Sequence, residues 1–63
     1  MNAEGLTAIK DAIGNLQDNR YRYALAESAN PGSVTGNGKP FTEVIARLDR
    51  LILKLKENLE DEE

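Results

Sequence analysis

The sequence contains neither cysteine nor histidine. Without cysteine the chain can form no disulfide and no thiolate metal site. Without histidine it lacks the commonest transition-metal ligand and the commonest general base of enzymes. Small domains usually rely on disulfides, metals or oligomerisation to become stable, so we expect oligomerisation or docking on a partner protein to supply the missing burial.

Long apolar runs and an excess of positive charge are also missing. The longest aliphatic run is Leu51–Leu53, which is far too short for a membrane span. Eleven acidic residues outnumber eight basic ones, and four of the acids form the C-terminal tail of residues 60–63. The start of the chain has no basic flank followed by an apolar run, so no signal peptide is expected. We therefore expect a soluble protein, in the cytoplasm or within a particle assembled inside a cell.

Two segments with helical periodicity flank a stretch that is rich in turn-forming residues. The first segment covers about residues 3–29, and its apolar stripe recurs at steps of three and four residues, as in a coiled coil: Leu6, Ile9, Ile13 and Leu16. The stripe continues through the polar positions Arg20, Tyr23 and Glu27. Gly14 and the residues up to Asn19 weaken the helix locally, which leaves its continuity there open.

The second segment covers about residues 41–61 and carries the stronger signal. Its broad apolar face consists of Phe41, Val44, Ile45, Leu48, Leu51, Ile52, Leu55 and Leu59. The helix is expected to start at Pro40 or Thr42, because proline is tolerated in a first helical turn and the Thr42 hydroxyl can cap it. Between the two segments, residues 30–40 contain Pro31, Pro40 and three glycines, which disfavour a helix.

These patterns predict an all-α fold: a two-helix antiparallel hairpin within a single domain of residues 1–63. A chain of 63 residues buries only roughly 60% of the surface that its unfolded form exposes. Two helices alone cannot enclose both apolar stripes, so we expect other chains to complete a helical bundle.

Catalytic and cofactor chemistry find little support in this sequence. The loop carries the Gly-Lys of a phosphate-binding loop, but Ser33 stands at its opening position and Pro40 replaces the hydroxyl residue that would hold magnesium. We interpret it as a connector. No pocket-forming sequence accompanies the carboxylates of the second segment. We expect no enzyme activity, no cofactor, no metal and no small-molecule substrate.

The most unusual local cluster is basic and aromatic, and it raises the alternative of nucleic-acid binding. Aromatic rings can stack on bases while guanidinium groups hold phosphates. The residues concerned are Arg20, Tyr21, Arg22 and Tyr23 in the first segment, and Arg47, Arg50 and Lys54 on the polar side of the second. Glu43, Glu57 and the acidic tail oppose this interpretation, and an ordinary solvated face is favoured.

Our leading functional hypothesis is a non-enzymatic structural or adaptor protein that acts through its apolar stripes. It would self-associate or pack on a larger protein, as a small subunit of a viral particle or another assembly would. The alternatives are a small nucleic-acid-binding regulator built on a helical bundle, and an acidic inhibitor protein that presents the tail. Leu53 lies off the stripe together with Ala46, and we interpret it as an ordinary exposed leucine.

Overall fold

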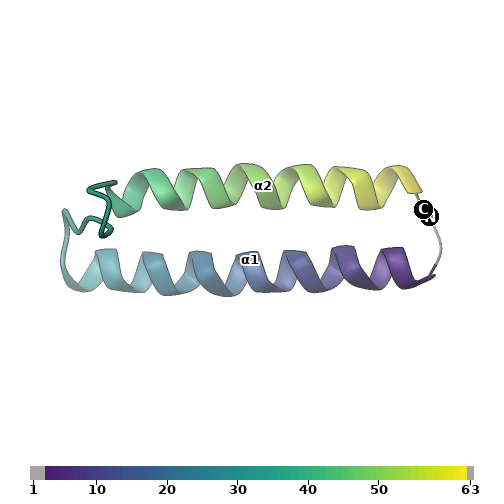
Figure 1. The fold of residues 1–63 in the computed structure, drawn as a ribbon, viewed down its shortest axis with the longest axis horizontal. Helices are drawn as coiled ribbons and strands as arrows, with labels where there is room; N and C mark the ends of the chain where they lie inside the picture. The colour runs from purple at the N-terminus through teal and green to yellow at the C-terminus, as the bar shows by residue number, and fades with distance from the viewer. Residues whose placement is uncertain (1–2, 63) are drawn as a thin grey trace.

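In the computed structural model the chain forms two antiparallel helices joined by a loop (Figure 1). The structure describes the backbone of residues 3–62 and the side chains of residues 3–59. Helix α1 spans Ala3–Ala29 and helix α2 spans Phe41–Glu62. Within residues 3–62 there is no strand, only an isolated antiparallel bridge between Val34 and Pro40. The predicted all-α hairpin is confirmed, and completion of a bundle by other chains stays a prediction.

Helix α1 continues without interruption through Gly14, the position at which the sequence left its continuity open. A glycine inside a helix costs about 1 kcal/mol relative to alanine. Neighbouring residues on the inner side of the helix offset this cost, because Ile13 is buried and Leu16 is half-buried. The helix ends with a bond from the Asn30 amide to the Ala26 carbonyl at 2.9 Å.

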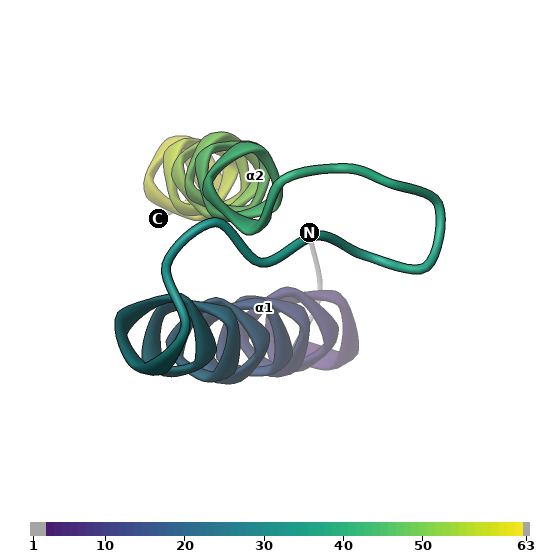
Figure 2. The same cartoon turned by 90° about the vertical axis from the view of Figure 1, so that its left-hand side faces the viewer.

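The loop is held by its own hydrogen bonds and by one contact with α1. The Gly32 amide donates to Glu27 Oε1 at 2.9 Å, with Gly32 at a φ of 88° that favours glycine. Thr35 organises the tip: its amide donates to the Lys39 carbonyl at 2.8 Å, and its carbonyl accepts the Gly38 amide at 2.9 Å. Figure 2 shows the loop extending sideways beyond the two helices.

The structure decides between the two expected starts of α2, Pro40 and Thr42. The helix begins at Phe41, so Thr42 lies inside the first turn and does not cap it. Pro40 takes the cap position, because its carbonyl accepts the amides of Glu43 at 3.0 Å and Val44 at 3.3 Å. The Phe41 amide donates to the Ser33 carbonyl at 3.0 Å, which ties the start of α2 to the loop.

The core of the hairpin is thin. The chain measures 42 × 19 × 14 Å, so it is a long slab two helices wide and one helix thick. Among the side chains that the structure describes, only Ile13 at 8% exposure and Ile52 at 7% are buried, one from each helix. The other apolar residues between the helices remain partly open to solvent.

Candidate interaction surface

The apolar stripes of both helices face each other, and most of their residues are half-buried. On α1 the half-buried members are Leu6, Ile9 and Leu16. On α2 they are Phe41, Val44, Ile45, Leu48, Leu55 and Leu59. Leu51 is the most open member of the stripe, with 38% of its surface exposed. A single layer of two helices thus covers one side of each residue and leaves the flanks uncovered.

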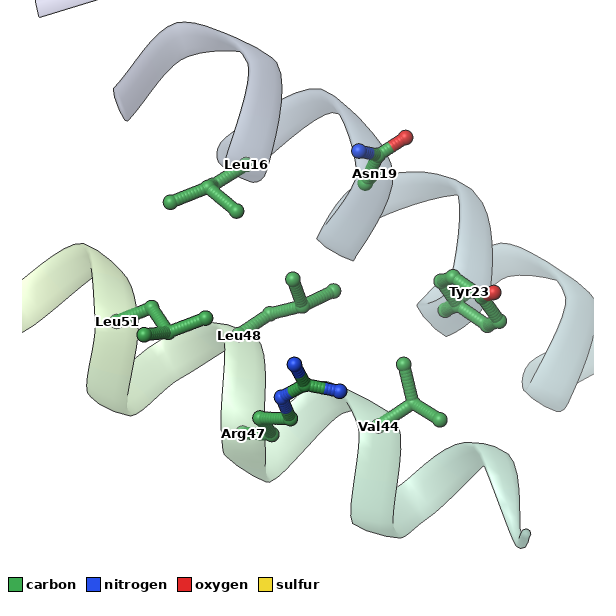
Figure 3. Close-up of a pocket in the computed structure, with 7 residues that line it drawn as sticks. All are labelled: Leu16, Asn19, Tyr23, Val44, Arg47, Leu48 and Leu51. Atoms are coloured by element: carbon green, nitrogen blue, oxygen red, sulfur yellow. The ribbon is translucent and has the colours of Figure 1, made fainter. Parts of the chain in front are cut away.

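One flank of the hairpin is hollowed into an apolar groove (Figure 3). Leu16 and Tyr23 of α1 form one wall, and Val44, Leu48 and Leu51 of α2 form the other. The groove has a volume of about 320 Å³. Its two polar lining residues are Asn19 from α1 and Arg47 from α2.

The groove continues toward the loop end of the hairpin past the ring of Tyr23. This ring packs edge-on against Phe41, with ring centroids 4.9 Å apart and an interplanar angle of 86°. Such edge-to-face pairs contribute about 0.5–1.5 kcal/mol beyond the area that they bury. A second hollow of about 270 Å³ lies there, lined by Asn19, Arg22, Tyr23, Ala26 and Phe41. The hollowed flank therefore extends over several turns of both helices.

The residues of the nucleic-acid alternative are only partly gathered on one face, since Tyr23 and Arg47 line the groove and Arg22 lines the second hollow. Arg20 Nε pairs with Asp49 Oδ1 across the two helices. Tyr21 is 64% exposed, whereas Tyr23, two positions later and nearly opposite around the helix, packs on Phe41. Arg22 pairs with Asp18, one turn earlier on α1, at 3.1 Å. Arg47, Arg50 and Lys54 are exposed on α2.

Asp49 and Glu27 make contacts that the sequence did not single out. The carboxylate of Asp49 forms an ion pair with Arg20, and Glu27 Oε1 accepts a hydrogen bond from the Gly32 amide of the loop. The available signal was the heptad pattern, since Arg20 and Glu27 occupy stripe positions on α1. A polar side chain that faces the other helix or the loop is expected to find a partner there.

The described side chains, those of residues 3–59, form no metal cluster, and neither helix of the described chain is a membrane-spanning one. In this part of the chain, no group of three or more acidic side chains is placed to hold a metal ion. Neither helix contains a stretch that is both long enough and apolar enough to cross a membrane. Comparisons with protein-family models, with curated protein sequences and with solved structures found no match for this chain.

Proposed function

We propose that this chain is a non-enzymatic structural or adaptor protein that acts by helix–helix association. It packs through its apolar flank on further copies of itself or on a larger partner. The observation that supports this proposal is the groove, which has apolar walls from both helices and leaves Leu51 38% exposed. Fully burying an aliphatic side chain contributes about 1.5–3 kcal/mol, so covering this flank would stabilise the chain and join it to its partner.

The layout of the groove matches that of protein interfaces. Interfaces have an apolar centre and a polar rim, and arginine is enriched in them. Here leucine, valine and tyrosine side chains form the walls, while Asn19 and Arg47 supply polar groups. A small subunit of a viral particle, or of another assembly, would fit this description.

A charged substitution in the groove tests the proposal. Leu51→Lys places an ammonium group where a partner would pack, whereas Leu53→Lys makes the same change at a residue that is 58% exposed and lies outside the groove. Lysine and leucine have similar helix propensities, so the two variants differ mainly in location. Light scattering on a size-exclusion column, repeated over a dilution series, measures the molar mass of each.

We expect the parent chain and Leu53→Lys to associate. Leu51→Lys should weaken association at least about 100-fold, because an unpaired buried charge costs several kcal/mol. For binding to a larger partner, the same two variants are compared by their retention in that complex. A parent chain that is a folded monomer at micromolar concentration and above would overturn self-association. Equal behaviour of the two variants would overturn the groove as the interface.

The second candidate is a small nucleic-acid-binding regulator, favoured by the exposed cations Arg47, Arg50 and Lys54. Phosphate contacts make affinity fall steeply with salt, so a gel-shift series at several salt concentrations tests it. Binding at low salt that is lost in Arg50→Glu would support this candidate, and no binding at low salt would eliminate it. The acidic-inhibitor alternative rests on residues 60–63, whose side chains lie outside the described residues.

A further inference from the structure

We propose that the occupant of the groove is a second copy of this chain. The two copies would be related by a two-fold axis parallel to the helices, so that both loops lie at the same end of a four-helix bundle. This inference rests on the proposed function and adds to it the partner and the arrangement. In this dimer, α1 of each copy packs on α2 of the other.

The exposed area of the chain leaves an uncovered surface of the size that a standard interface needs. A compact protein of 6.9 kDa is expected to expose about 4000 Å², whereas this chain exposes 4669 Å². The excess of about 700 Å² is close to the roughly 800 Å² that each partner contributes to a standard interface. The broad face of the hairpin, 42 by 19 Å, is large enough to supply that area. A second hairpin has a face of matching length.

The two edges of the groove differ in size, and this difference selects the arrangement. On the α1 edge the small side chains Asn19 and Ala26 line the groove and the second hollow, and Ala12 lies seven residues before Asn19 on the same line of the helix. The α2 edge carries the larger Val44 and Leu51, also seven residues apart. Close packing requires large side chains opposite small ones. This requirement is met when α1 lies on the partner's α2, and it is not met when like helices face each other.

The register of the hairpin supports knobs-into-holes packing in that dimer. Two observations show which residues of α1 and α2 lie at the same height along the hairpin. They are the Arg20–Asp49 ion pair and the presence of Asn19 and Arg47 in the same groove. A rotation about an axis parallel to the helices does not change the height of any residue along that axis. Each residue of the partner's α1 therefore lies at the same height as the corresponding residue of the first copy. Leu51 then lies between the levels of Ala12 and Asn19 of the second copy, where a leucine knob fits a hole lined by small residues.

Charged residues at and beside the rim of the groove could pair in the same dimer. Asp11 and Arg22 are eleven residues apart on α1, and Glu43 and Lys54 are eleven apart on α2, so each pair lies on one line of its helix. All four side chains are exposed. When α1 packs on the partner's α2, Lys54 lies within about one helical turn of the level of Asp11, and Glu43 within about one turn of the level of Arg22. The same charges could also pair between like helices in a dimer whose loops lie at opposite ends. Finding which charges pair therefore tests the arrangement that was inferred from side-chain size.

A charge-swap series tests the arrangement. Lys54→Glu should raise the dimer dissociation constant about tenfold at low salt, because it turns two attractive contacts per dimer into repulsive ones. Adding Asp11→Lys should restore association. Lys56→Glu is the matched control, since it makes the same change on the other side of α2 and should leave association unchanged. Rescue by Glu43→Lys in place of Asp11→Lys would overturn the arrangement while leaving self-association intact.

A distance measurement gives an independent answer. Gly36 is exposed, and a Cβ added there would meet no atom within 4 Å, so Gly36→Cys can carry a spin label at the loop tip. With both loops at one end, double electron–electron resonance should give a label separation below about 30 Å, because neighbouring helices lie about 8–10 Å apart. A separation near the 42 Å length of the hairpin would overturn the proposal. A labelled chain that stays monomeric at all concentrations would overturn both this proposal and self-association.

Discussion

Replacing Ile52 by alanine should remove a large part of the stability of this chain. Ile52 is 7% exposed and is one of only two buried side chains among the described residues. Isoleucine-to-alanine changes in protein cores cost about 2–5 kcal/mol. The core here is thin, so neighbouring side chains can relax into the space, and we expect a loss of about 2–3 kcal/mol. Urea unfolding followed by circular dichroism measures this loss from the midpoint at an unchanged slope.

Leu53→Ala is the matched control for that experiment. Leu53 lies next to Ile52 on the same helix but is 58% exposed, so its loss should cost less than about 1 kcal/mol. Both variants are compared with the parent at one protein concentration, because association makes apparent stability depend on concentration. If Ile52→Ala does not fold, Ile52→Val replaces it, with an expected cost of about 0.5–1.5 kcal/mol. Equal losses in Ile52→Ala and Leu53→Ala would refute the assignment of the core.

Three further changes follow from the backbone and the ion pair. Gly14→Ala should stabilise the chain by about 1 kcal/mol, since its Cβ meets no atom within 4 Å and alanine favours the helix; thermal unfolding measures it. Gly32→Ala should destabilise it by about 1–2 kcal/mol because of the φ of 88°, whereas Gly36→Ala, also in open space, should be near neutral in the same assay. Removing the Arg20–Asp49 pair with Asp49→Asn should cost under about 1 kcal/mol, since both side chains are near half-exposed, and the loss should shrink in high salt.

The sequence was sufficient to predict the fold class because each helix carries its own signal. Apolar residues at steps of three and four require a helix to share one face, and the turn formers between the segments require the chain to reverse. Continuity at Gly14 could not be decided in this way. The local cost of one glycine is small beside the packing of Ile13, which exists only once α2 is in place. The sequence did not decide between Pro40 and Thr42 as the start of α2, because local capping preferences do not include the hydrogen bond from the Phe41 amide to the Ser33 carbonyl.

The groove was less predictable than the stripes that form its walls. Periodicity identifies which residues face the other helix, but it does not show which flank of the pair stays open. That outcome depends on the crossing of the two helices and on side chains at the edges, such as Asn19 and Arg47. Both are polar, so the apolar pattern did not include them, and Arg47 was predicted only as a nucleic-acid contact.

Toward the loop end of the hairpin, polar contacts join the apolar packing, and this follows from how the α1 stripe changes along its length. From Leu6 to Leu16 the stripe is aliphatic, and its contribution is burial, which salt does not screen. Further on, Arg20 and Glu27 replace aliphatic residues and make polar contacts with Asp49 and the loop. Only the Arg20 contact is with α2, so the pair with Asp49 favours one register of α1 against α2, whereas the Glu27 bond joins the end of α1 to the loop. Because the proposed dimer uses that register to set Leu51 between Ala12 and Asn19, the Arg20–Asp49 pair contributes to the same arrangement that the apolar residues stabilise.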